Sequence, residues 1–222
     1  MEVKNKEMYH IHRNGIYDNI WKVGNEIIID DNFNSCFCSN LDVPSGVRTS
    51  DGKICTLDHY IKIIINSINS KEKLLELKQL DEKEFINKGN YLVQVLRDSS
   101  IKLKNLSIKN REEALEEVRK EKFNNLPSRF HSIWLCDENS IDFWEKKLGK
   151  DSTIYKVLVT GEMFKSYDYL LPTDGKTKAE QKIEAKDYWN PKINEEKHKE
   201  TTEYLFQGKV KVKKIINLNN IK

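Results

Sequence analysis

Alternation of apolar and polar residues predicts β-strands in both the N-terminal and the C-terminal parts of the chain. Residues 8–13 alternate in this way and are followed by Asn14-Gly15, which is a turn signal. Further segments are rich in β-branched and aromatic residues, a composition that favours strands. They cover residues 26–29, 131–136 and 153–160.

Apolar residues three and four positions apart predict a helical block from Thr56 to about Phe123. Within it, Ser70 and Asn110 are residue types that cap the start of a helix. Residues 91–103 fit either a strand or a buried helix. We therefore expect several helices between the two strand-rich ends of the chain.

Two short helices are expected among the strands. The first covers residues 16–23 and stops at Gly24, and the second covers residues 141–148 and is closed by Gly149. Glycine is the residue that most often ends a helix, because it adopts the left-handed conformation needed there.

The C-terminal segment predicts a β-hairpin. Glu203 precedes a short apolar run, a turn is expected at Gly208, and alternating lysine and valine residues follow. A strand is likewise expected to end at Gly161, and residues 167–202 show no periodicity, so we expect an irregular segment there. Glu203 is a candidate for a functional carboxylate, although a glutamate before a strand is more often a solvated end residue.

Length and charge bound the class of protein. The chain of 222 residues fits a single α+β domain over residues 1–222 that carries a helical insertion at residues 54–125. It has 38 basic and 35 acidic residues, a balance that does not indicate nucleic-acid binding by itself. No apolar run approaches the roughly 20 residues needed to span a bilayer. We expect a cytoplasmic protein that does not enter a membrane.

Several common chemistries lack their sequence motifs. The nine glycines form neither a dinucleotide-binding fingerprint nor a phosphate-binding P-loop. Zinc binding by Cys36, Cys38, Cys55 and His59 is disfavoured, because Cys-x-Cys is not the usual zinc-knuckle spacing. Cys136 has no assignable base nearby in the sequence. No metal site is predicted, and the cysteines are interpreted as thiols.

Four stretches, taken in order, indicate a family. The first is Tyr9-His10-Ile11-His12-Arg13, which is followed by a strand that begins just after Gly24. The next is Ser132-Ile133-Trp134-Leu135, which is followed by a helix containing Phe143 and by the strand at residues 153–157. Thr201-Thr202-Glu203-Tyr204-Leu205 comes last. Together they resemble ADP-ribosyltransferases of the diphtheria-toxin and PARP type, among them rifampicin-modifying transferases and DNA-modifying bacterial toxins.

The resemblance covers residues 8–29 and 127–217, and the sequence departs from the family pattern at three positions. Trp134 stands where tyrosine is usual, and His12 stands where serine or threonine is common. Thr201 stands where arginine-modifying relatives have glutamate or glutamine. Modification of arginine is therefore not expected.

The resemblance implies a split antiparallel β-sheet around a cleft that binds NAD as a substrate. It assigns catalytic roles to Glu203 and His10. It implies NAD contacts for His10, His12, Arg13, Arg129, Ser132, Trp134 and Phe143. Without the resemblance, the histidines and aromatic residues would be interpreted as core residues and the arginines as solvated charges.

The same resemblance implies a mono-ADP-ribosyltransferase that modifies RNA, DNA or protein. A role as a bacterial toxin or antiviral-defence effector, with an antitoxin protein as partner, is typical of such domains. Two alternatives stay open: an NAD-dependent RNA 2′-phosphotransferase, and a non-catalytic interaction module on the same fold. The charged run at residues 195–200 is either an acceptor-recognition loop or an ordinary loop. Lysines 209, 211 and 213 either contact phosphate or protect an edge strand.

Overall fold

The computed structural model describes most of the chain. The described residues are 1–15, 17–33, 46–48, 54–56, 59, 61–62, 65, 81–149, 151–192 and 196–216. Contacts divide the chain into two units, Met1–Ser39 with Asn110–Lys222, and Asn40–Lys109. The predicted cap at Ser70 and its helix lie outside the described residues, as do Cys36 and Cys38.

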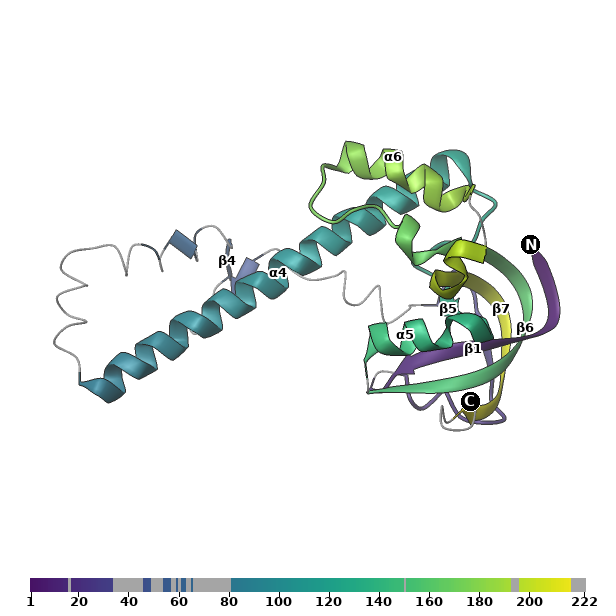
Figure 1. Cartoon of the computed structure of the whole chain (residues 1–222), viewed down its shortest axis with the longest axis horizontal. Helices are drawn as coiled ribbons and strands as arrows, with labels where there is room; N and C mark the ends of the chain where they lie inside the picture. The colour runs from purple at the N-terminus through teal and green to yellow at the C-terminus, as the bar shows by residue number, and fades with distance from the viewer. Residues whose placement is uncertain are drawn as a thin grey trace. The chain divides into compact units, whose positions relative to one another are not determined.

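The first unit is built on an antiparallel sheet, which agrees with the expected α+β class. Its strand order is β1-β6-β7-β2. Strands β5 and β2 both pair with β7, β5 with residues 204–206 and β2 with residues 208–211. The strands are β1 (Glu2–Arg13), β2 (Glu26–Ile29), β5 (Ile133–Leu135), β6 (Ser152–Tyr167) and β7 (Thr202–Ile216). Figure 1 shows β6 and β7 curving together along most of their length.

Strand β5 also connects to β1, so that backbone pairing returns to the strand where it began. Tyr9 and Cys136 form an isolated antiparallel bridge. The amide of Tyr9 donates to the carbonyl of Cys136 at 3.0 Å, and the amide of Cys136 donates to the carbonyl of Tyr9 at 2.9 Å. Hydrogen bonding therefore runs from β1 through β6, β7 and β5 back to β1, which leaves little of this part of the sheet as open edge.

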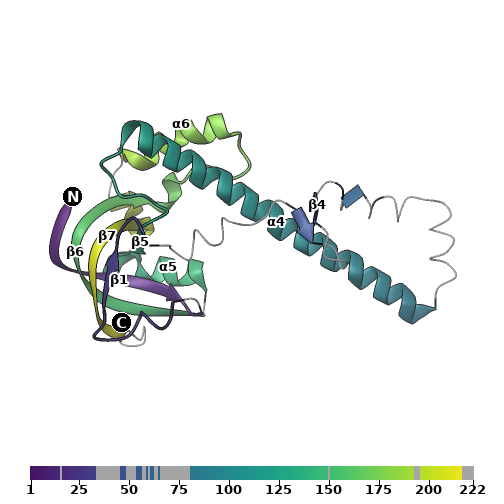
Figure 2. The ribbon, with the colours of Figure 1, turned by 180° about the vertical axis from the view of Figure 1, so that it is seen from behind.

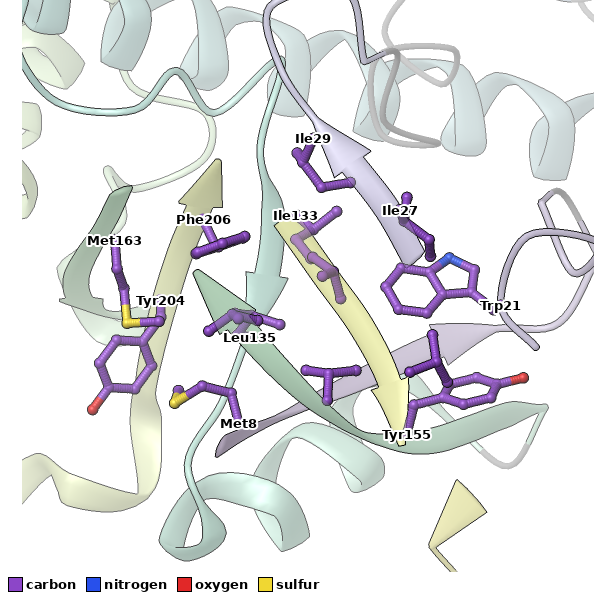
Figure 3. Packing of buried hydrophobic residues seen from close by; sticks show 14 residues of the cluster. Met8, Trp21, Ile27, Ile29, Ile133, Leu135, Tyr155, Met163, Tyr204 and Phe206 are labelled. Atoms are coloured by element: carbon purple, nitrogen blue, oxygen red, sulfur yellow. The ribbon is translucent and has the colours of Figure 1, made fainter. Parts of the chain in front are cut away.

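One face of the curved sheet holds the main hydrophobic core of the first unit. Alternation along the strands sends every second side chain to this face, and Trp21 covers it from the segment between β1 and β2. Figure 3 shows these side chains converging between the strands. The buried set is Met8, Trp21, Ile27, Ile29, Ile133, Leu135, Tyr155, Val157, Val159, Met163, Tyr204, Phe206, Val210 and Val212.

Helices cover parts of the opposite face. They are α5 (Ile141–Leu148), α6 (Lys178–Trp189) and the last turns of α4 (Glu82–Lys122). Figures 1 and 2 show α6 beside the C-terminal end of α4. Trp189 fixes this contact, because its indole N–H donates to the carbonyl of Leu115 at 2.8 Å. Leu115, Val118, Phe164, Leu205 and Trp189 share one buried cluster on this face.

The predicted hairpin turn at Gly208 was wrong, since β7 continues through it. Gly208 lies directly opposite Gly161 on β6, and that strand also continues beyond the expected end. Both glycines have positive φ, +137° and +151°. A Cβ on Gly161 would lie 2.7 Å from the Cα of Gly208 and would collide with the carbonyl oxygen of Gln207. The two glycines therefore permit a close approach of two backbones within a sheet.

Three helix predictions also need correction. Asn110 lies inside the continuous helix α4 instead of starting a new one. Residues 91–103, for which both strand and helix were left open, belong to the same helix. Helix α6 occupies part of the segment 167–202 that was expected to be irregular, and its start is fixed by a capping box at Thr177. Residues 17–20 form a turn where a short helix was expected. The prediction for α5, closed by Gly149, was confirmed.

The remaining described elements are short. In the second unit, β3 (Gly46–Arg48) pairs with β4 (Ile54–Thr56). The 3-10 helices are η1 (Glu138–Ser140), η2 (Asp168–Leu170) and η3 (Glu196–Thr201). Within the described part of the chain, no helix is both long enough and apolar enough to cross a membrane.

Candidate functional site

Glu203 is buried at the start of β7. Strand alternation places it on the helix-covered face with Leu205, whereas Tyr204 and Phe206 point into the main core. Only 2% of Glu203 is exposed. Its Oε1 atom accepts two hydrogen bonds, one from Nη1 of Arg129 at 2.9 Å and one from the hydroxyl of Tyr188 at 2.5 Å.

Arg129, in the segment between α4 and β5, connects Glu203 to a second buried carboxylate. Its Nε atom donates to Oε2 of Glu112 at 2.6 Å, and its Nη2 atom donates to Oε1 of Glu112 at 3.4 Å. Glu112 lies on α4 and is fully buried. The Arg129 guanidinium also lies 4.9 Å from the ring centre of Tyr188. We call Glu112, Arg129, Tyr188 and Glu203 the buried ion cluster.

The chemistry of arginine fixes the direction of each hydrogen bond in the buried ion cluster. Arginine can only donate, so the hydroxyl of Tyr188 accepts from Arg129 and donates its own proton to Glu203. Burial raises the pKa of Tyr188 well above its ordinary value, against the lowering effect of the Arg129 charge. Tyr188 therefore stays protonated, as its role as a donor requires.

Positive and negative charges are paired in and around the buried ion cluster. Burial by itself would lower the pKa of Arg129, but the charge of Glu112 is the largest of several effects that raise this pKa well above its usual value. A second guanidinium, that of Arg111, lies 3.3 Å from Oε1 of Glu112 and 3.0 Å from Oδ1 of Asp174. Buried charges persist in proteins when they are paired in this way.

The second oxygen of Glu203 differs from the first. Oε1 accepts two hydrogen bonds, whereas no described residue donates one to Oε2. An ionised carboxylate offers about four acceptor positions. Glu203 is thus a carboxylate held firmly through one oxygen, with acceptor capacity left on the other.

His10 lies on β1 and is bonded to the backbone of β5. Its Nδ1 lies 2.9 Å from the carbonyl oxygen of Trp134, and its ring stacks on Trp21 with centres 3.9 Å apart. Burial lowers the pKa of His10 from 6.5 to about 4, while the bond to Trp134 raises it and His12 lowers it further. The ring is therefore neutral at pH 7. A carbonyl only accepts, so Nδ1 carries the proton and Nε2 is an acceptor.

His12 forms a separate pair with Asp18. Its Nε2 lies 2.7 Å from Oδ1 of Asp18, and His12 is 5% exposed while the Asp18 side chain is 54% exposed. The amide of Gly15 also donates to both carboxylate oxygens of Asp18. This amide, and then the bond from His12, lower the pKa of Asp18. The carboxylate fixes the orientation of the His12 ring.

Four of the predicted site residues lie in one continuous chain of contacts. His10 bonds to the carbonyl of Trp134, the Trp134 ring lies 5.4 Å from the Arg129 guanidinium, and Arg129 bonds to Glu203. These residues come from β1, β5, the segment before β5, and β7. Ser132 lies close by in sequence and is fully buried, with a hydroxyl that has no hydrogen-bond partner among the described residues.

Two predicted site residues lie apart from this chain of contacts. Arg13 is exposed at the end of β1. Phe143 is half-buried on α5, with its ring edge-on to that of Trp144 at 5.2 Å and below the Lys147 ammonium group. The indole N–H of Trp144 donates to the carbonyl of Thr202, directly before Glu203, at 2.8 Å.

Sequence reasoning missed two members of the buried ion cluster. Glu112 belongs to the charged run 111–122, whose alternating charges predict a solvated helix face, and this prediction was wrong for the buried Glu112. Tyr188 belongs to the segment expected to be irregular. One local signal could have found α6, because Thr177 and Glu180 have the spacing of a capping box. No local signal indicates that Glu112 contacts Arg129, since that contact depends on tertiary packing.

No metal centre is found in the described part of the chain, where no group of three or more histidine, cysteine or acidic side chains is suitably placed. A family model described as a protein of unknown function, DUF2441, matches residues 8–218. A comparison with curated proteins found no match.

Proposed function

Because the chain belongs to the DUF2441 family, whose description assigns no activity, we propose a function from the site itself. The protein is a mono-ADP-ribosyltransferase that cleaves NAD and transfers ADP-ribose to a macromolecular acceptor. The observation that carries this proposal is the state of Glu203, a buried carboxylate held through Oε1 with acceptor capacity left on Oε2.

Glu203 has the chemistry that this reaction requires. The bond between C1′ of the ribose and the nicotinamide nitrogen breaks, its electron pair leaves with nicotinamide, and positive charge develops on the ribose. A fixed carboxylate stabilises such an oxocarbenium-like transition state, as in glycoside hydrolysis. Oε2 can accept a ribose hydroxyl. The acceptor then forms a bond to C1′ with its own electron pair and loses its proton.

The neighbouring residues supply further parts of an NAD site in this proposal. Neutral His10 can accept a ribose hydroxyl at Nε2, because Nδ1 is already used by Trp134. The half-buried Trp134 ring offers a stacking surface for nicotinamide. Both residues connect through Arg129 to Glu203. The finer description of the fold as a split ADP-ribosyltransferase-like sheet belongs to this proposal.

The geometry changes the role proposed for Arg129. Its Nε and Nη1 donors are bonded to Glu112 and Glu203, so they are engaged before any ligand arrives. We therefore propose that Arg129 orients Glu203 and does not bind the pyrophosphate.

The engagement of the Arg129 donors also disfavours an RNA 2′-phosphotransferase, which needs several free arginine and histidine donors around one phosphate. Action as a toxin or defence effector, with an antitoxin partner, remains part of the proposal on the strength of the resemblance.

The test is release of nicotinamide from NAD by the full-length protein, with RNA, DNA and bacterial lysate offered separately as acceptors. We expect release that depends on one acceptor and that falls at least about a hundredfold in Glu203→Gln. Glu116→Gln is the matched control, because Glu116 is also a buried glutamate bonded to an arginine, Arg119, at 2.7 Å. Absence of NAD binding and of nicotinamide release with every acceptor would favour the non-catalytic interaction module.

A further inference from the structure

The orientation of the Glu203 carboxylate depends on two donors from different elements. Arg129 approaches Oε1 from the segment before β5, and Tyr188 approaches the same atom from the end of α6. Rotation of the carboxylate would break both hydrogen bonds. Hydrogen bonds to charged groups are stronger than neutral ones, so the pair gives a defined orientation.

Tyr188 is itself held firmly. It is fully buried, and its ring lies edge-on to Phe164 and Trp189, with centres 6.1 and 5.0 Å away. Its backbone carbonyl accepts the hydroxyl of Ser166 at 2.8 Å, and Ser166 is the residue that pairs with Glu203 across β6 and β7. The hydroxyl of Tyr188 therefore has a fixed position relative to Glu203.

Glu112 gives Arg129 a matching constraint. Its two oxygens contact Nε and Nη2, which leaves Nη1 for Tyr188 and Glu203. A guanidinium held by a carboxylate on one side presents its remaining donors in a known direction, because the group is planar and rigid.

We propose that Tyr188 and Glu112 are positioning residues for the catalytic carboxylate. Tyr188 holds Oε1 of Glu203 directly, Glu112 does so through Arg129, and together they present Oε2 to the ribose of NAD. This inference rests on the proposed function. It adds that the rate of the chemical step depends on two residues that do not touch the substrate.

The proposal predicts a specific defect in Tyr188→Phe, which removes one hydroxyl and keeps the ring. We expect kcat for nicotinamide release to fall roughly tenfold to a hundredfold, the usual effect of losing a hydrogen bond to a charged group. KM and the calorimetric Kd for NAD should change less than about threefold, since the substrate contacts remain.

Tyr167→Phe is the matched control. Tyr167 is also a buried tyrosine, but its hydroxyl has no hydrogen-bond partner among the described residues. Removal of this hydroxyl should leave both kcat and KM unchanged. A purely structural role for the Tyr188 hydroxyl would instead lower stability without lowering kcat.

A second pair of variants tests Glu112 independently. Glu112→Gln should lower kcat by about tenfold or more, and Glu112→Asp should recover part of the loss because it keeps the charge that holds Arg129. Wild-type kcat in both Tyr188→Phe and Glu112→Gln, with Glu203→Gln inactive, would overturn the positioning proposal alone. Failure of the wild-type protein to bind or cleave NAD would instead overturn the proposed function.

Discussion

At the scale of single residues, Arg129 supplies the positive charge that compensates two buried glutamates. It is 3% exposed and bonds to both Glu112 and Glu203, which are themselves buried. Removal of one partner from a buried ion pair leaves an uncompensated buried charge. The resulting loss in folding free energy is far larger than the net contribution of the intact pair.

Arg129→Met should therefore lower the free energy of unfolding by about 3–5 kcal/mol, as measured by urea denaturation at pH 7. Arg119→Met is the comparison. Arg119 pairs with one buried glutamate, Glu116, which also lies 3.9 Å from the ammonium group of Lys120, whereas Arg129 pairs with two, so a smaller loss is expected for Arg119→Met. Equal losses in the two variants would show that the buried ion cluster is no more critical than an ordinary helix ion pair.

His10 makes stability depend on pH in one direction. Burial is the main cause that lowers its pKa from 6.5 to about 4. Between these values the unfolded chain binds a proton at His10 that the folded chain does not, so acidification favours unfolding. The shifted pKa of His10 contributes at most about 3 kcal/mol to the free energy of unfolding. This contribution is complete above pH 6.5 and is lost as the pH falls toward about 4.

The variant His10→Asn should show a shallower loss of stability across this pH window than the wild-type protein. The measurement is the slope of unfolding free energy against pH, from denaturant curves at several pH values between 4 and 7. The slope is decisive because loss of stacking on Trp21 lowers stability equally at every pH. Identical slopes would mean that His10 titrates alike in the folded and unfolded chains.

At the scale of elements, Gly161 and Gly208 allow β6 and β7 to stay paired through a close backbone contact. Gly161→Ala should destabilise the protein by about 2–4 kcal/mol, because the new methyl group meets backbone atoms that cannot move separately. Gly24→Ala is the control, since Gly24 also has positive φ, +94°, with open space at the position that a Cβ would occupy. Its expected cost is about 1–2 kcal/mol, from backbone strain alone. Thermal and denaturant unfolding of both variants would separate collision from strain, and equal costs would contradict the close approach.

At the scale of the whole molecule, local sequence patterns predicted elements better than the contacts between them. Period-two alternation located β1, β-branched and aromatic composition located β2 and β5, and a glycine stop signal located the end of α5, because these features depend on neighbouring residues. Gly208 was misread for the same reason, since its role depends on Gly161 across the sheet. The elements predicted from the sequence were therefore enough to assign the α+β fold class.

The candidate site shows the same limit. Arg129, Trp134 and Glu203 could be named singly from the sequence, but their proximity requires β5 to pair with β7 and to bridge to β1. Tyr188 required an α-helix in a segment that lacks clear amphipathic periodicity. The sequence therefore indicated candidate residues, while the hydrogen bonds that orient them come from tertiary structure.

The position of Arg129 over the Trp134 ring has an optical consequence. A positive charge 5.4 Å from an indole ring alters the energy of its excited state, so the emission of Trp134 depends on where that charge lies. The other tryptophans, Trp21, Trp144 and Trp189, lie in different surroundings, because Trp21 stacks on His10 and the indoles of Trp144 and Trp189 donate to backbone carbonyls. A protein that keeps Trp134 alone would carry a built-in fluorescent reporter of Arg129. Any ligand that draws the guanidinium away from Glu203 would then be visible without a label.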